Sequence, residues 1–330
     1  MTAVPEFEEL AEPPARRGAP LPASPAKVWA ALWLVYLVWG STYLGIRLAI
    51  ESMPPQVSIG LRFLVAAPIL GLIVVARQGA GRLRVTRAEL GGAALVGVML
   101  LGVGMSTVTL AERYVPTGVA ALLVAVTPVW IVLLRTFTGD RPRLVTWLGV
   151  GTGLLGVAIL VLPSSDVATV GDATSSQRAF WSLLIVIGAA SWAGGSFLQP
   201  RIPTPRDPLV MSTYEMLFGG LALVLVGLLR GEQIGQMLDA TPRSWAGWVY
   251  LVVVGSLITF SAFVWLIDHA PLSLVSTYAY VNPVVAVALG ALVLGEPLTA
   301  GLLLGGAVVV AGVALVVSGE RLGKQPPPAA

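Results

Sequence analysis

Ten long apolar runs constrain the fold of this chain more than any other feature of its sequence. Each run holds about twenty residues, the length that a helix needs to cross the hydrocarbon core of a bilayer. Lipid offers the backbone no hydrogen-bond partners, so a single spanning segment of this kind must be helical. We therefore predict an all-α polytopic membrane protein with ten transmembrane helices, over the windows Val28–Ala49, Val57–Ala76, Leu90–Ala111, Val115–Leu134, Leu144–Leu162, Phe180–Gln199, Leu209–Leu229, Trp245–Ile267, Leu272–Leu294 and Thr299–Ser318.

The composition excludes several other classes of protein. Charged residues make up 11% of the chain and hydrophobic residues 56%, whereas soluble domains carry about 25% charged residues. The chain has no cysteine and a single histidine, His269, which excludes disulfides, thiolate metal ligands and multi-histidine sites. We therefore expect no metal and no cofactor. The formal charge of +3 gives no indication of a nucleic-acid partner.

The positions of Lys and Arg predict how the chain sits in the membrane, because cytoplasmic connections carry an excess of both. With a cytoplasmic N-terminus, fourteen basic residues fall on the cytoplasmic side and four on the outer side. The fourteen are Arg16, Arg17, Lys27, Arg77, Arg82, Arg84, Arg87, Arg135, Arg141, Arg143, Arg201, Arg206, Arg321 and Lys324, and the four are Arg113, Arg178, Arg230 and Arg243. We expect both termini in the cytoplasm, with 1–27 as a disordered tail, 163–179 as an outer linker and 319–330 as a second tail.

The two halves of the chain repeat each other. Trp39 and Trp192 lie 153 residues apart, as do Arg62 and Glu215, and three proline pairs lie 155 residues apart: Pro116 with Pro271, Pro128 with Pro283 and Pro142 with Pro297. Residues 28–162 and 180–318 each hold five predicted helices, and an odd number makes the second copy enter the membrane from the opposite side. We predict an inverted repeat, with a site near the midplane between the two copies and alternating access to it.

Two predicted helices carry a helix breaker near their middle. Thr277-Tyr-Ala-Tyr-Val-Asn-Pro283 lies inside a run without charge from 270 to 295, and Thr127-Pro128 takes the matching place in the first half. Each proline frees a carbonyl one turn back, which a polar neighbour or a ligand can satisfy. We expect Thr127, Pro128 and Pro283 to act as hinges and Asn282 to face the substrate. The alternative is that Thr and Asn satisfy the freed groups internally.

Aromatic and hydroxyl side chains also occur at mid-depth in both halves. Tryptophans belong near the headgroups, so Trp39 and Trp192 in mid-membrane require another purpose. With Ser41, Tyr43 and Ser196 they are predicted to line a pocket for partly apolar ligands, although ordinary packing explains them equally well. Tyr278 shares a helix face with Asn282, so we expect it to face the cavity while Tyr280 packs.

Arg62 and Glu215 are the charges inside otherwise uncharged predicted helices. Intramembrane charges are rare and usually face a cavity or a partner. We expect Arg62 to guide a substrate carboxylate and Glu215 to bind a proton or an amine. Inverted symmetry places them at opposite depths, which argues against a mutual salt bridge. The alternative is that both side chains extend to the nearby headgroups or cap loops.

Several motifs together resemble the EamA domain of the drug/metabolite transporter superfamily. They are Trp39-Gly-Ser-Thr-Tyr-Leu-Gly-Ile-Arg-Leu-Ala, Gly60-Leu-Arg-Phe63, Ala111-Glu-Arg-Tyr-Val-Pro-Thr-Gly-Val-Ala-Ala-Leu-Leu, Ser276-Thr-Tyr-Ala-Tyr-Val-Asn-Pro-Val-Val-Ala and Leu294-Gly-Glu-Pro-Leu298. The resemblance covers residues 28–318 and implies two inverted EamA repeats in a bacterial inner membrane, so that the linker 163–179 is periplasmic. It also implies that four helices of each repeat surround a cavity, that the fifth packs outside, and that small metabolites are exported. The first repeat departs from the second, with Asp140-Arg-Pro142 where the second has Gly295-Glu-Pro297.

These observations predict a secondary transporter that moves small amino-acid-like metabolites outward by alternating access. The expected partners are a small-molecule substrate and the lipid bilayer, and both proton coupling and a homodimer are compatible with this prediction. A membrane sensor or assembly partner without transport is the alternative. An intramembrane enzyme would need a cluster of His, Asp or Ser, whereas the predicted spans hold two isolated charges. The match of residues 151–156 to GxGxxG lies inside a span and is interpreted as a packing face.

Overall fold

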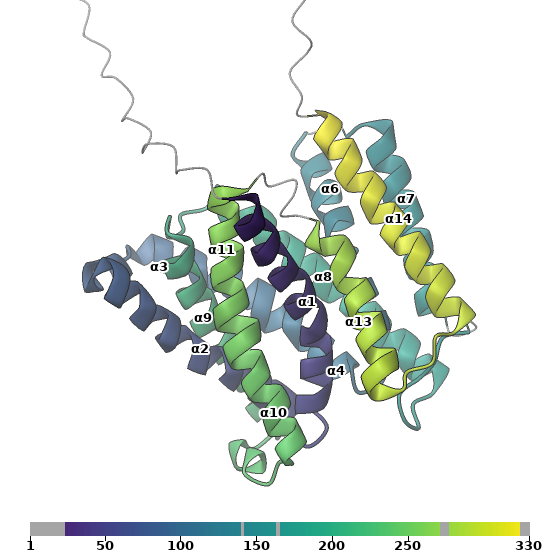
Figure 1. The fold of residues 1–330 in the computed structure, drawn as a ribbon, viewed down its shortest axis with the longest axis horizontal. Helices are drawn as coiled ribbons and strands as arrows, with labels where there is room; N and C mark the ends of the chain where they lie inside the picture. Colours follow the sequence, from purple (N-terminus) through teal and green to yellow (C-terminus); the bar gives the residue numbers. More distant parts are fainter. Residues whose placement is uncertain (1–23, 140–141, 163–165, 271–276, 324–330) are drawn as a thin grey trace, which may run out of the picture.

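The structure is a computed structural model that describes residues 24–139, 142–162, 166–270 and 277–323. Within these ranges nine helical stretches are long and apolar enough to cross a membrane, and a tenth, shorter apolar helix lies at 278–294. The ten-helix all-α prediction is therefore confirmed (Figure 1). The first repeat contains α1 (Pro25–Ala49), α2 (Pro55–Gln78), the third span α3–η2–α4 (Arg87–Gly97, Val98–Met105, Ser106–Ala111), the fourth span α5–α6 (Thr117–Val124, Thr127–Phe137) and α7 (Leu144–Val161).

The second repeat follows the same order. It contains α8 (Ser175–Leu198), α9 (Pro208–Leu229), the eighth span α10–η5–α11 (Pro242–Tyr250, Leu251–Ile258, Thr259–His269), α13 (Tyr278–Leu294) and α14 (Ala300–Gly323). Short helices lie in the connections: η1 (Ala80–Leu83) in the first repeat, and η3 (Gln199–Arg201) and η4 (Ile234–Met237) in the second. Local sequence sets the starts of the helices. Pro55, Pro208 and Pro242 lie in first turns, where a missing N–H costs nothing. Thr86 and Thr174 begin α3 and α8 with capping boxes.

The third helix of each repeat is π-helical at its centre. The segments η2 and η5 are both eight residues long and start at Val98 and Leu251, which are 153 positions apart. This is the spacing of the sequence repeat, so the two copies share a local distortion that apolar periodicity does not reveal. π-helical turns widen a helix and often occur at functional sites.

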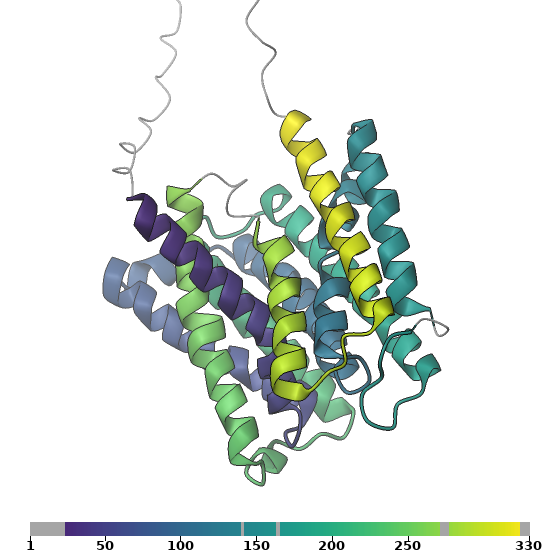
Figure 2. The same cartoon turned by 45° about the vertical axis from the view of Figure 1, so that its right-hand side comes forward.

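The two repeats interlock in space. Helix α1 packs against α10, α11 and α13 of the second repeat, and α8 packs against η2, α4, α5 and α6 of the first. Helices α2 and α9 pair with each other, and so do α7 and α14, which stand together at one side of the bundle (Figures 1 and 2). The first helix of each repeat therefore packs among helices of the other repeat, and the fifth helix of each lies at the edge of the bundle.

The pair α7–α14 is held by close backbone contact. A Cβ on Gly312 would collide with the backbone of Gly153, and a Cβ on Gly156 would lie 2.5 Å from the backbone nitrogen of Val309. Small residues let membrane helices approach in this way. The interpretation of 151–156 as a packing face therefore holds for Gly153 and Gly156, while Gly151 faces open space.

The two predicted helix breaks differ. The fourth span is interrupted, because α5 ends at Val124 and α6 begins at Thr127. Helix α13 runs through Pro283 without a break, which corrects the expectation that Asn282–Pro283 divides its helix. The predicted start of this span, at 272, lies outside the described residues. A proline lacks one backbone N–H, so α13 loses the single hydrogen bond that residue 283 would otherwise donate one turn back.

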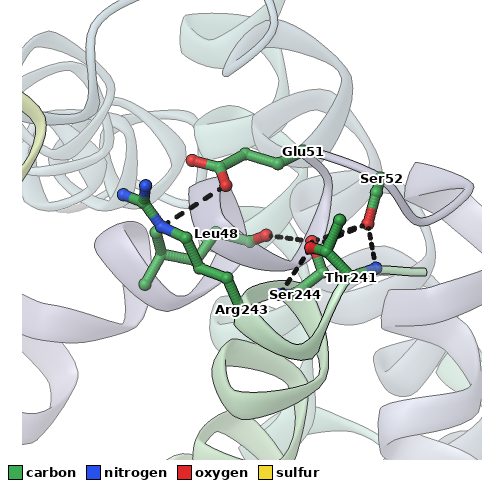
Figure 3. A network of polar contacts seen from close by, with 6 residues as sticks. All are labelled: Leu48, Glu51, Ser52, Thr241, Arg243 and Ser244. Carbon is green, nitrogen blue, oxygen red and sulfur yellow. Dashed lines mark hydrogen bonds and ion pairs between the residues drawn. The ribbon is translucent and has the colours of Figure 1, made fainter.

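The start of α1 and the end of α14 lie at one end of the bundle, and we call the opposite end, with the connections 50–54, 112–116, 230–241 and 295–299, the distal end (Figures 1 and 2). Here α1 is tied to α10 by the network in Figure 3. The Ser244 hydroxyl donates to the Leu48 carbonyl (2.7 Å), the Ser52 hydroxyl donates to Ser244 (2.9 Å), and Arg243 pairs with Glu51 (3.5 Å). Which end faces the cytoplasm stays a prediction.

Candidate substrate site

An aromatic cluster joins the two repeats. The Trp39 ring of α1 meets the Tyr278 ring of α13 edge-on at 5.1 Å and the Phe263 ring of α11 at 4.7 Å, and Phe263 lies 5.9 Å from Tyr278. Tyr43, one turn along α1, packs against the main hydrophobic core, whereas Trp39, Phe263 and Tyr278 pack against a smaller buried cluster. Edge-on aromatic pairs of this kind contribute about 0.5–1.5 kcal/mol beyond the area they bury. Trp39 and Tyr278 are thus brought together across the two repeats, and their role as a pocket wall stays a prediction.

A polar group lies on the opposite face of α1. The hydroxyls of Ser41 and Tyr250 are hydrogen-bonded to each other (2.5 Å), and Ser41 donates to the Val38 carbonyl (2.9 Å). Tyr250 is the last residue of α10, directly before the π-helical segment η5. Ser41 therefore fixes α1 to the eighth span at the point where that span changes its helical geometry.

Arg62 lies in α2, against the same π-helical segment. Its Nε donates to the Ser256 hydroxyl (2.9 Å), and its guanidinium lies over the Phe63 ring at 4.8 Å. A Cβ on Gly255 would lie 3.1 Å from Nη2, so this glycine makes room for the guanidinium. The residue is 5% exposed, and Nη1 has no hydrogen-bond partner among the described residues. Arg62 is thus buried in the bundle instead of extending to the headgroups.

Glu215 lies in α9 and is also buried, at 9% exposure. The Ser212 hydroxyl donates to its Oε2 at 3.5 Å, and its backbone lies close enough to Gly97 that a Cβ there would sit 2.6 Å from the Glu215 carbonyl oxygen. No ion pair between Arg62 and Glu215 occurs within the described residues. The two charges therefore lie in separate surroundings, as inverted symmetry predicts.

The matching aromatic of the second repeat has different neighbours. Trp192 in α8 packs against η2 of the first repeat, where a Cβ on Gly104 would lie 3.2 Å from the indole. Beside it, Ser191 donates to the Met99 carbonyl (2.9 Å), and Ser196 is half-buried one turn further along α8. Trp39 and Trp192 thus each contact the third span of the other repeat, at two separate places.

The residues at the helix breakers make internal contacts. The Thr127 hydroxyl donates to the Val124 carbonyl (2.6 Å) at the end of α5. In the orientation that satisfies its surroundings, the Asn282 amide donates to the carbonyls of Tyr278 (3.1 Å) and Tyr36 (3.2 Å), which joins α13 to α1. Both contacts agree with the alternative of internal satisfaction. The hinge and substrate roles of Thr127, Pro128, Asn282 and Pro283 stay predictions.

Two glutamates at the distal end have roles that sequence analysis did not identify. Glu296 follows Gly295, whose positive φ of 68° ends α13, and it accepts from the backbone N–H groups of Thr117 (2.8 Å) and Gly118 (3.4 Å) at the start of α5. Glu232 follows Gly231 (φ 85°) and accepts in the same way from the second and third residues of α2 at 3.3 and 2.9 Å. Each carboxylate of the second repeat therefore caps a helix of the first.

The repeated pair Gly-Glu after an apolar run is a signal that could have identified these caps. The first repeat has Gly139-Asp140 at the corresponding turn, and Asp140 lies outside the described residues. Sequence analysis also counted Arg178 only as an outer charge. Its side chain is fully buried and donates to the carbonyls of Leu160 (2.5 Å) and Leu162 (2.9 Å), so it caps the end of α7.

A cavity of about 410 Å³ opens at the distal end. Arg47, Glu51, Arg243 and Glu296 contribute its charged side chains, together with residues 168–171 and 293–295. The candidate substrate residues do not line it.

Comparisons with known proteins add to this geometry. A sequence profile of the EamA-like transporter family matches residues 28–162 and 179–318. The chain is 36% identical over 296 residues to the uncharacterized inner membrane transporter YedA of Escherichia coli strain K12, with 89% of this chain and 92% of YedA covered. It is 22% identical over 298 residues to the uncharacterized transporter YoaV of Bacillus subtilis, with 87% and 95% covered.

A solved crystal structure shows the same fold. It superimposes with a TM-score of 0.59 at 20% sequence identity, and the match covers 92% of this chain and 100% of that chain. At this identity the similarity concerns the fold alone.

Proposed function

Because the chain belongs to the EamA-like transporter family of the drug/metabolite transporter superfamily, we propose that it exports small amino-acid-like metabolites by alternating access. The protein is a multi-pass transporter of the inner membrane. The proposal adds the substrate class, the direction and the mechanism. The direction follows the resemblance to exporters, and the mechanism follows the inverted repeat, in which two related halves rock about a site between them.

One observation carries the substrate class: Nη1 of the buried Arg62 guanidinium has no hydrogen-bond partner among the residues that the structure describes. A buried donor without a partner is costly, and a guanidinium is suited to binding a carboxylate through two parallel hydrogen bonds. Arg62 lies where α2 of the first repeat meets η5 of the second, so a carboxylate bound there would contact both halves. Movement of one half against the other would then make or break this site.

The aromatic cluster supplies the second part of a binding site. Trp39 belongs to the first repeat and Tyr278 and Phe263 to the second, so the apolar portion of a metabolite would also rest between the halves. Glu215 is proposed as the site of a substrate amine or a proton. It is buried and has one weak hydrogen-bond partner at 3.5 Å among the described residues.

The test is transport by purified protein in liposomes loaded with a mixture of amino acids and purines. We expect release of carboxylate-bearing solutes by the wild type, and a loss of at least about tenfold in Arg62→Gln, which equals about 1.4 kcal/mol of lost interaction. Arg84→Gln is the matched control, because Arg84 is exposed in the connection after α2. Equal rates for the two variants would remove Arg62 from the mechanism.

The same liposomes test the remaining assignments. Trp39→Ala is expected to lower the rate, whereas Trp33→Ala, on the exposed side of α1, is expected to leave it unchanged. Glu215→Gln is measured across pH, and an unchanged rate and pH dependence would exclude Glu215. Retention of every solute by the wild type would contradict transport of this substrate class.

A further inference from the structure

Glu112 is a buried carboxyl that has no hydrogen-bond partner within the described part of the chain. It directly follows Ala111, the last residue of the third span, and has no exposed surface. Neither Oε1 nor Oε2 has a partner among the described residues. A carboxylate in such a place would lose its hydration without compensation, and a protonated carboxylic acid carries a much smaller cost.

The charges around Glu112 come from two other segments. From α1, Nη1 of the Arg47 guanidinium donates to the backbone carbonyl of Glu112 (2.7 Å). Arg47 therefore binds the peptide oxygen of Glu112 and not its carboxyl oxygens, which have no partner among the described residues. Tyr43 of the same helix interacts electrostatically with the carboxyl. From the connection between α13 and α14, Glu296 adds a second acid nearby. In the sequence next to Glu112, Arg113 is exposed.

The balance of these groups favours the neutral acid. Burial raises the pKa of the Glu112 carboxyl well above its usual range, Arg47 opposes that shift, and the negative charge of Glu296 adds to it. Glu296 accepts two backbone N–H groups at the start of α5, whereas neither carboxyl oxygen of Glu112 has such a partner among the described residues. Of these two side chains, Glu112 is therefore the one whose charged form lacks stabilisation.

We propose that Glu112 is a proton-binding site: it holds a proton in the conformation seen here and exchanges it with water at the distal end during transport. Arg47 and Glu296, its two charged neighbours, both line the distal cavity, so water comes close to the carboxyl. The role in transport rests on the function proposed above, whereas the bound proton does not.

Release of this proton would have a defined structural consequence. It would change the Glu112 side chain from neutral to negative beside Glu296, whose carboxylate holds the start of α5 against the end of α13. Repulsion between the two carboxylates would weaken that contact. The proton on Glu112 is therefore expected to favour the packed distal end, and its loss to favour an open one.

Infrared titration of the full-length protein in lipid nanodiscs tests the bound proton without any substrate. A protonated carboxylic acid has a C=O stretch above the amide region, and we expect one at neutral pH that disappears at higher pH. Glu112→Gln keeps the shape of the side chain but has no acid, so the part of the band that Glu112 contributes should be lost, whereas any part from the buried Glu215 should stay. In Glu51→Gln, which removes a partly exposed carboxylate paired with Arg243, the band should stay.

Two outcomes would overturn the proposal: the same band in Glu112→Gln as in the wild type, or no band in the wild type at neutral pH. If Glu112→Gln does not fold, the same titration of Glu296→Gln tests the proposal. This variant removes the second negative charge but keeps a side-chain oxygen that can accept the backbone N–H groups at the start of α5. The wild-type band should then disappear at lower pH than before, and an unmoved midpoint would contradict the proposal.

Liposomes loaded with the amino-acid mixture test the role of the proton in transport. Wild-type release should depend on an imposed pH gradient, and Glu112→Gln should release solute at a rate that the gradient no longer changes. An unaltered dependence in Glu112→Gln would overturn the coupling role. Absence of all release by the wild type would count against the proposed function, while the infrared band would still decide whether Glu112 holds a proton.

Discussion

At the scale of single residues, the second repeat supplies the polar groups that hold the first repeat in place. Glu232 and Glu296 both follow a glycine with positive φ and cap a helix of the first repeat. A carboxylate at a helix N-terminus satisfies orphan N–H groups and interacts favourably with the helix dipole, by up to about 2 kcal/mol when partly buried. Within the Leu294–Leu298 motif, Gly295 thus ends α13 and Glu296 caps the start of α5.

A glycine inside α13 makes the second cap feasible. A Cβ on Gly290 would collide with Oε2 of Glu296, so Gly290→Ala is expected to displace that carboxylate and destabilise the protein by about 1–3 kcal/mol. Unfolding in mixed micelles with increasing denaturing detergent measures the change. Gly91→Ala is the control, because a Cβ there meets nothing within 4 Å and a helical alanine is favoured by up to about 1 kcal/mol. Equal stability of both variants would contradict the role of Gly290.

At the scale of helices, the two repeats match in distortion as well as in order. The π-helical segments η2 and η5 lie 153 residues apart, and each packs against the helices that carry the candidate site residues, α8 and α9 for η2 and α1 and α2 for η5. A widened turn leaves carbonyls without their usual partner and lets neighbouring side chains approach, as Ser191 does at Met99. The proposed site is therefore built around the third helix of each repeat.

The pair α7–α14 is expected to depend on its glycines. A Cβ on Gly312 would collide with the backbone of Gly153, which has no side chain that could move aside. We expect Gly312→Ala to cost about 1–3 kcal/mol in the same detergent titration. Gly151→Ala, on the open side of α7, serves as the control and is expected to be neutral or slightly stabilising. If Gly312→Ala proved as stable as Gly151→Ala, the pair would not rest on this contact.

At the scale of the whole molecule, interlocking explains why the candidate residues contact across the two halves. Because α1 lies among helices of the second repeat and α8 among helices of the first, Trp39 and Trp192 each meet a partner from the other half. A relative movement of the repeats changes all of these contacts at once. That property is what alternating access requires.

Orientation is a prediction that belongs to this scale. The excess of Lys and Arg in the connections at the end where α1 starts and α14 ends predicts that this end faces the cytoplasm. A green fluorescent protein fused after Ala330 should therefore fluoresce, and alkaline phosphatase fused there should be inactive. Phosphatase fused after Gly231, at the distal end, should be active. The reverse pattern would show the opposite orientation.

The sequence by itself determined the membrane class, the ten helices, the repeat and the family. These properties depend on the length of apolar runs and on spacings along the chain, and lipid leaves the backbone few other options. The helix ends were predicted to within a few residues because prolines and capping residues mark them. The inverted repeat also predicted that Arg62 and Glu215 do not pair, and they have different hydrogen-bond partners, Ser256 and Ser212.

Only the tertiary structure decided which polar side chains meet. Asn282 was expected to face a substrate, and its amide donates to the backbone carbonyls of Tyr278 and Tyr36, which belong to helices far apart in the sequence. Glu112 and Glu296 lie near each other only because the distal connections of both repeats converge. Burial and the partners of a charge depend on which helices pack together, and apolar periodicity carries no information about that pairing.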